Sequence, residues 1–176
     1  MLAEIPTIES ERLVLGPWSE AHFDAYAAFW RDEETARFVG GACARDDAWR
    51  RMATIVGHWS LRGYGFWALT EKSSGAFVGW CGPWMPEGWP EREIGWGLLP
   101  AAQGKGYATE AAIRSRSYAY DVLGWKTTIS LIDMQNFPSQ RVAERLGARF
   151  EGTHLLRGSE AGIFRHPSPQ DLQNLN

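Results

Sequence analysis

The stretch "LLPAAQGKGYATEAA", residues 98–112, decides how the rest of the chain is interpreted. Gly104 and Gly106 flank Lys105, directly after an apolar run and directly before a run of helix-forming residues. A glycine-rich turn that opens a helix leaves backbone N–H groups free to hold a phosphate group, and the helix dipole adds about half a positive charge there. The stretch therefore predicts a phosphate-binding loop.

The spacing of the glycines does not fit the two better-known phosphate-binding motifs. A Walker A loop has Ser or Thr after its lysine, whereas Gly106 follows Lys105 here. The dinucleotide fingerprint has a third glycine where Thr109 stands, and it normally opens a fold rather than following antiparallel hairpins. We therefore expect a pyrophosphate on the helix N-terminus, with Lys105 adding a screened charge and Gln103 a side-chain amide.

Composition and charge narrow the class of protein. A chain of 176 residues, 44% hydrophobic and 22% charged, is expected to form a single domain over residues 1–176. Its net charge of −3 argues against a nucleic-acid partner, and no apolar run is long enough to cross a membrane. The acidic N-terminal stretch does not resemble a signal peptide, so we expect a cytoplasmic protein. Cys43 and Cys81 have neither CxxC spacing nor neighbouring histidines, so no disulfide or metal site is expected.

Hydrophobic periodicity alternates between strand and helix along the chain. It predicts an α/β domain with a mixed sheet of about seven mostly antiparallel strands and about four helices. The expected strands lie within residues 12–18, 64–72, 75–85, 91–100, 126–133, 148–153 and 162–168, and the expected helices within 19–32, 46–63, 106–125 and 136–147. The tail, residues 167–176, is expected to be frayed.

The loop and its flanks resemble a known family. "QGKGYA", residues 103–108, matches the Q/R-x-x-G-x-G/A signature of the GNAT superfamily of N-acetyltransferases. "EIGWGLLP" before it and "GYATEA" after it look like the branch of ribosomal-protein N-terminal acetyltransferases, called RimJ/RimL-like. "SERLVLGPW" is similar to the opening of that branch, with Gly16 where arginine is common, and "NFPSQRVAERLGARFEG" is similar to its N-x-x-S segment. The resemblance spans nearly the whole chain.

The resemblance implies a GNAT fold and acetyl-CoA as cosubstrate. In that fold two parallel strands splay apart in the middle of the sheet, and the pantetheine arm of acetyl-CoA lies in the gap. It implies no metal and no covalent enzyme intermediate. The implied cosubstrate-binding residues are Leu98 and Leu99 through their backbone, Gln103, Gly104, Lys105, Gly106, Tyr107 and Ala108 at the pyrophosphate, and Asn136 and Ser139 from the other side.

The resemblance also implies catalytic roles. Glu93, at the start of the splayed strand, would remove a proton from the attacking amine, and a backbone N–H near Leu98 would stabilise the developing oxyanion. Many members of the family carry a tyrosine acid where this chain has Ala143. Ser139 is a possible substitute, although a thiolate whose thiol pKa is about 8.5 also leaves without an acid. His154 and His166 are weaker candidates for the base.

Each of these residues also has an ordinary structural explanation. Glu93 is alternatively a solvated carboxylate at a strand end, and Lys105 a solvated loop charge. Ser139 is alternatively the cap of the last helix, and Asn136 a turn residue.

The resulting hypothesis is an N-acetyltransferase that moves acetyl from acetyl-CoA to a primary amine in a ternary complex. The acceptor is either a protein N-terminal α-amine or a small-molecule amine. The alternatives are transfer from a different acyl-CoA and a non-catalytic CoA-binding sensor. The sequence is equally consistent with a monomer and a homodimer.

Overall fold

The computed structural model describes residues 4–174, and a single mixed sheet organises them. Its strands follow the order β1-β2-β3-β4-β5-β6-β8-β7. Every neighbouring pair is antiparallel except β5 and β6, which are parallel. The strands are β1 (Ile8–Glu9), β2 (Leu13–Gly16), β3 (Trp67–Glu71), β4 (Phe77–Trp84), β5 (Glu93–Leu98), β6 (Ile129–Asp133), β7 (Arg149–Leu156) and β8 (Ser159–Arg165).

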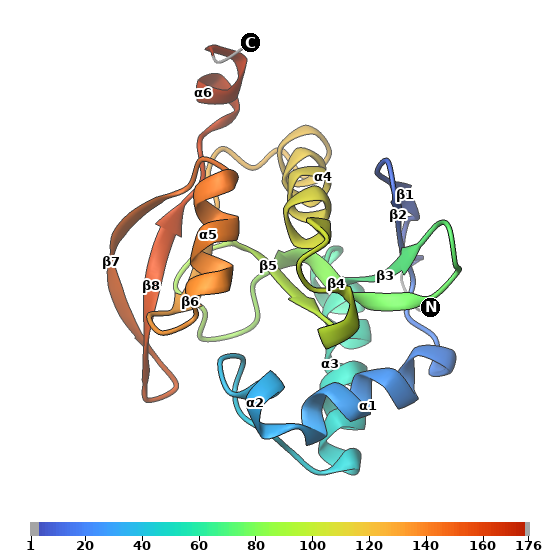
Figure 1. The fold of residues 1–176 in the computed structure, drawn as a ribbon. Helices are drawn as coiled ribbons and strands as arrows, with labels where there is room; N and C mark the ends of the chain where they lie inside the picture. The colour runs from blue at the N-terminus through green and yellow to red at the C-terminus, as the bar shows by residue number, and fades with distance from the viewer. Residues whose placement is uncertain (1–3, 175–176) are drawn as a thin grey trace.

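Helices cover both faces of the sheet. Helices α4 and α5 lie over one face, and α1, α2 and α3 lie on the opposite side (Figure 1). The helices are α1 (Phe23–Arg31), α2 (Glu33–Ala36), α3 (Arg45–Arg62), α4 (Tyr107–Asp121), α5 (Phe137–Arg145) and α6 (Pro169–Asn174), with 3-10 turns at Glu20–His22 and Pro100–Ala102. The arrangement confirms the predicted mixed α/β sheet with one parallel pair near its middle.

Three short elements differ from the expectation. Strand β1 has two residues, too few to show an alternating pattern. Asp32 accepts a hydrogen bond from the Thr35 N–H, which starts α2 directly after α1. The tail expected to be frayed contains α6 over residues 169–174, because Ser168 and Asp171 bond reciprocally at its start; residues 175–176 of that tail lie outside the described part.

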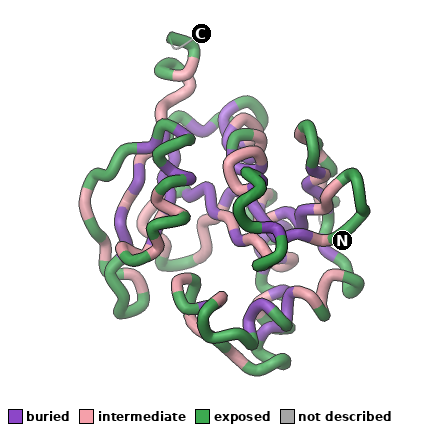
Figure 2. The backbone as a smooth tube through the Cα atoms, in the orientation of Figure 1, coloured by how far each residue is buried: buried purple, intermediate pink, exposed green. Residues whose placement is uncertain are grey.

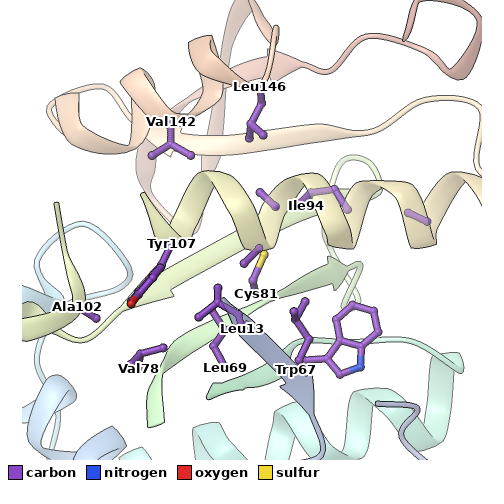
Figure 3. Close-up of a cluster of buried hydrophobic side chains, with 14 of the residues drawn as sticks. Leu13, Trp67, Leu69, Val78, Cys81, Ile94, Ala102, Tyr107, Val142 and Leu146 are labelled. Atoms are coloured by element: carbon purple, nitrogen blue, oxygen red, sulfur yellow. The ribbon is translucent and has the colours of Figure 1, made fainter. Parts of the chain in front are cut away.

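Buried side chains of residues 4–174 gather on both faces of the sheet, in three clusters. Figure 2 shows buried backbone concentrated in the central strands and the inner side of α4, whereas β7 is mostly exposed. On the α4 side, Cys81 and Ile94 belong to the cluster in Figure 3, and Val142 of α5 and Leu146, directly after α5, join it from above. The second cluster, beneath α1 and α3, contains Trp80. The middle strands are therefore held between helices on both faces.

Glycines in β4 and β5 allow very close packing at the centre of the sheet. A Cβ on Gly82 would lie 2.2 Å from the carbonyl oxygen of Gly65. A Cβ on Gly97 would lie 2.3 Å from the indole ring of Trp80. The absent side chains therefore let backbone and aromatic rings rest directly on the strands that border the parallel pair.

We predict that Gly82→Ala destabilises the protein by about 1–3 kcal/mol, because its methyl group would meet rigid backbone rather than a flexible side chain. The matched control is Gly57→Ala in α3, where a Cβ meets no atom within 4 Å. That change should stabilise the protein by about 0.5–1 kcal/mol. Urea unfolding of both variants checks this, and equal stability of the two would contradict it.

Candidate active site

The parallel pair β5–β6 separates as soon as it has formed. Within residues 4–174, its register pairs Glu93 with Ile129 and goes no further. The Ile129 N–H donates to the Arg92 carbonyl at 3.0 Å, the first hydrogen bond of a parallel ladder. Because no further pairing follows, a gap opens between the two strands toward their C-terminal ends.

Two side chains occupy the position of the next ladder bond. A regular parallel ladder would join the Leu131 N–H to the Ile94 carbonyl. Instead, the Leu131 N–H donates to Oε1 of Glu93 at 3.0 Å, and the Ser130 hydroxyl donates to the Ile94 carbonyl at 2.6 Å. Both backbone groups stay satisfied, so the strands separate without leaving these two groups buried and unpaired.

The backbone of β5 presents alternate residues to the gap. The Leu99 N–H donates to the Val78 carbonyl, and the Leu99 carbonyl accepts from Ala102. Successive residues of an antiparallel strand direct their backbone N–H and C=O groups to opposite sides. The backbone groups of Leu98 and Trp96 therefore point away from β4 and toward the gap. The Leu98 N–H thus points into the gap, whereas both backbone groups of Leu99 are engaged within the protein. The cosubstrate contacts expected of Leu98 and Leu99 stay predictions.

The loop after β5 has the shape of an anion-binding helix start. Gly104 has φ 75° and Gly106 has φ 82°, a left-handed conformation that favours glycine. Gly106 precedes α4, and no side chain caps the helix there, so the N–H groups of Tyr107 and Ala108 have no partner within the helix. A Cβ on Gly104 would meet no atom within 4 Å. The exposed, uncapped loop fits a diphosphate group.

The larger side chains of the loop are bound by the protein itself. Gln103 donates its amide to the Leu98 carbonyl at 3.3 Å. The Lys105 ammonium lies 3.9 Å from a carboxylate oxygen of Glu71, which also accepts a hydrogen bond from the Tyr107 hydroxyl. The backbone amides are therefore the main anion-binding groups of the loop, and the half-exposed Lys105 ammonium lies beside them.

Glu93 is a buried carboxyl group at the closed end of the gap. It is 6% exposed, and Oε2 accepts a hydrogen bond from the Trp89 indole at 2.6 Å. Burial raises the pKa of Glu93 to about 7, although the hydrogen bonds from Leu131 and Trp89 act in the opposite direction. This burial contradicts the alternative of a solvated strand-end carboxylate. At neutral pH the group can both accept and release a proton.

A second buried chain of hydrogen bonds supports the same strands. Arg116 donates to Nδ1 of His166 at 3.2 Å, so Nε2 carries the imidazole proton and donates to the Ser130 hydroxyl at 2.8 Å. Burial and the nearby cations Arg116 and Arg165 lower the pKa of His166 to about 3. His166 therefore cannot take a proton from Ser130, so Ser130 and His166 do not form a nucleophile and its base. This corrects the expectation that His166 is a candidate base.

Helix α5 begins at the same edge of the sheet as the glycine loop, because β5 and β6 are parallel and each is followed by one of them. Asn136 caps α5 by accepting a hydrogen bond from the Ser139 N–H at 3.2 Å. The cap is thus Asn136, and Ser139 lies one turn inside the helix. Glu93 lies at the other end of β5, about 17 Å of strand away.

The cysteines, possible metal ligands and helix lengths of the described residues complete the account of the site. Cys43 and Cys81 are both free, and burial raises the pKa of the Cys81 thiol. Among residues 4–174, no group of His, Cys, Asp and Glu is placed to hold a metal ion. In the same part of the chain, no helix has the length and apolar character that a membrane span requires.

The contacts of three residues at the site were not predicted from the sequence. Ser130 helps to separate the strands, Trp89 hydrogen-bonds Glu93, and Arg12 contacts the glycine loop through the carbonyl of Lys105 at 2.9 Å. Each acts on a partner brought close by folding. The one available signal was the "SERL" stretch, whose arginine had no local function.

A parallel pair that opens beside an uncapped, glycine-rich helix start is the architecture of an acyltransferase that uses an acyl-CoA. A family model described as "Acetyltransferase (GNAT) domain" matches residues 12–149. The chain therefore belongs to the GNAT acetyltransferase family, and its mixed sheet is the GNAT fold. GNAT acetyltransferases use acetyl-CoA as cosubstrate.

Individual relatives agree with this assignment. The acetyltransferase from Agrobacterium tumefaciens str. C58 superposes with a TM-score of 0.85 at 30% identity, covering 93% of this chain and 95% of that chain. YkkB of Bacillus subtilis is 35% identical over 118 residues, 63% of this chain and 69% of YkkB. A ribosomal-protein-S5-alanine acetyltransferase from Vibrio fischeri superposes with a TM-score of 0.72, covering 94% of this chain and 98% of that chain. Its 14% identity makes it evidence for the fold alone.

We predict that ionisation of Glu93 weakens the folded state. Its pKa is about 7 in the fold and 4.5 ordinarily, so the folded state binds more protons between these values and stability falls as pH rises through them. Relative to Glu93→Gln, the parent should lose on the order of 2 kcal/mol of unfolding free energy between pH 5 and pH 8.5. Denaturant unfolding at both pH values measures this.

The control for this prediction is Glu91→Gln, two residues away. Arg165 lowers the pKa of Glu91 below its ordinary value. The stability that ionised Glu91 contributes is therefore fully present above the ordinary pKa and is lost only as the pH falls below that value. The difference between the parent and Glu91→Gln should therefore stay constant from pH 5 to pH 8.5. A constant difference for Glu93→Gln as well would contradict the raised pKa.

Proposed function

We propose that this chain transfers an acetyl group from acetyl-CoA directly to a primary amine, with Glu93 as the general base. The observation that carries the proposal is the buried Glu93 carboxyl, with a pKa of about 7, at the closed end of the gap. Bound acetyl-CoA supplies the activated thioester. The free backbone amides of residues 104–108 hold its diphosphate, which seats the phosphate end at the open end of the gap.

The gap-facing backbone of β5 has two proposed tasks. The N–H and C=O groups of Trp96 and the N–H of Leu98 bind the extended arm of the cosubstrate, as a neighbouring strand would. One of these N–H groups stabilises negative charge on the carbonyl oxygen during attack. The Asn136 amide and the Ser139 hydroxyl contact the arm from the β6 side. Because Ser139 lies at the loop end of the gap and Glu93 at the other end, the thiolate leaves without Ser139 as acid, which a thiol pKa of about 8.5 allows.

The pKa of Glu93 favours an α-amino group as acceptor. A general base works best when its pKa lies near that of the group it deprotonates and near the working pH. An α-amino group has a pKa of about 8, whereas that of a lysine side chain is about 10.4. We therefore propose a protein or peptide N-terminus as the acceptor, the class used by the RimJ/RimL-like branch that the sequence resembles, and place small-molecule amines second.

We expect the loop to bind acetyl-CoA through its uncharged backbone. Gly104→Asn and Gly104→Asp form a matched pair, because both residues tolerate a left-handed φ and the space over Gly104 is open. The Asp variant adds negative charge beside the diphosphate and should bind acetyl-CoA at least tenfold more weakly than the Asn variant in calorimetric titrations. Equal affinities would rule out a diphosphate at this loop, and absence of binding by the parent would also exclude the CoA-binding sensor.

Kinetics test the base. With an accepted N-terminal peptide, Glu93→Gln should lower kcat by about 10²–10⁴-fold while leaving the KM for acetyl-CoA within a few-fold. In the parent, kcat/KM should rise with pH through about 7, because the deprotonated carboxyl is the active form. CoA thiol release measures both quantities. Full activity of Glu93→Gln would show that Glu93 is not the general base. If no amine reacts although acetyl-CoA binds tightly, the chain is the non-catalytic CoA-binding sensor. If another thioester reacts faster than acetyl-CoA, the chain uses a different acyl donor.

A further inference from the structure

Arg12, the residue directly before β2, hydrogen-bonds to the glycine loop, residues 103–106, although it lies far from that loop in sequence. Its Nη1 donates to the Lys105 carbonyl at 2.9 Å. Its Nε donates to Oε2 of Glu110 at 2.7 Å, and its backbone N–H donates to Oε1 of the same carboxylate at 2.7 Å. Ser10 donates to Glu110 as well. Arg12 therefore joins the first turn of α4 and the preceding loop in one hydrogen-bonded unit.

This grip sets the orientation of one loop amide. A trans peptide is planar, and its C=O and N–H point in opposite directions. Because Nη1 of Arg12 holds the Lys105 carbonyl, the N–H of Gly106 in the same peptide unit must point away from Arg12. The remaining nitrogen of the guanidinium, Nη2, lies 3.4 Å from the Cβ position of Gly106. The cation is thus beside the helix start.

Charge balance at the loop also depends on Arg12. Glu110 lies in the first turn of α4, where its carboxylate would repel a bound diphosphate. Burial would raise the pKa of Glu110, but the hydrogen bonds from Arg12 and Ser10 outweigh this and lower it, so the group is ionised at neutral pH. The adjacent guanidinium neutralises that charge.

We infer that Arg12 is a positioning residue for the diphosphate of acetyl-CoA. It holds the Lys105–Gly106 peptide so that the Gly106 N–H is available to the anion, and it offsets the charge of Glu110. The inference rests on the proposed function and adds to it a residue that lies far from the signature in sequence. The loop glycines give the backbone its shape, and Arg12 keeps that shape in one orientation.

The test is calorimetric titration of the parent, Arg12→Gln and Arg114→Gln with CoA. Arg114 is the matched control, because it also ties α4 to the N-terminal segment, donating to the Glu9 carbonyl at 3.0 Å about two turns beyond the loop. We expect Arg12→Gln to bind CoA about tenfold more weakly, as for loss of one charged hydrogen bond, and Arg114→Gln to bind within twofold of the parent. Thermal unfolding without ligand confirms that both variants fold.

Further measurements separate positioning from other roles. In the thiol-release assay, Arg12→Gln should raise the KM for acetyl-CoA about tenfold and leave kcat within twofold, a split that general loss of structure would not produce. Dephospho-CoA should lose the same factor as CoA; an undiminished affinity for dephospho-CoA would instead make Arg12 a ligand of the 3′-phosphate. Arg12→Lys keeps the charge beside Glu110 without the two-nitrogen geometry, so it should bind CoA more tightly than Arg12→Gln and more weakly than the parent.

Two outcomes would overturn the inference. Arg12→Gln binding CoA within twofold of the parent would show that the loop needs no support. Full recovery of affinity in the double variant Arg12→Gln/Glu110→Gln would show that Arg12 acts by neutralising charge alone. Failure of the parent itself to bind CoA is a different result, because it removes the proposed function rather than the role of Arg12.

Discussion

The missing hydrogen bond between Leu131 and Ile94 is the constraint on which the site depends. In an ordinary parallel pair it would bring β5 and β6 together along their length. Here the Glu93 carboxyl accepts the hydrogen bond of the Leu131 N–H, and the Ser130 hydroxyl donates to the Ile94 carbonyl. The strands therefore separate without leaving either backbone group unpaired. The resulting gap lies between the glycine loop at one end and the Glu93 carboxyl at the other.

The same arrangement explains the raised pKa of the buried Glu93 carboxyl group. A side chain inserted at the point of separation is shielded from water by both strands, and burial is what raises the pKa of Glu93. On the other strand, Ser130 is held by His166, which is held in turn by Arg116. Structural hydrogen bonds therefore place the Glu93 carboxyl, and the cost of burying it is the origin of its raised pKa.

Much of the fold was accessible from sequence because it depends on local signals. Helix α4, the hairpins before it and the mixed sheet were predicted from periodicity and turn residues, and the family followed from the loop and its flanks. The elements that were missed are short: β1 has two residues and α2 has four. Their formation depends on pairing and capping contacts that carry no periodic pattern.

The local sequence determines two parts of the site: the glycines of the loop and the position of Glu93 at the start of a strand. Each depends only on a few neighbouring residues in the chain. Burial of Glu93, the partners of Ser130 and the grip of Arg12 on Lys105 depend on residues that meet only in the folded protein, up to 93 positions apart in the last case. Folding also decided that Leu99 faces the sheet and Leu98 the gap, because that alternation is set by hydrogen bonding to β4. Short-range chemistry specifies the parts of the site, and long-range packing specifies their charge and orientation.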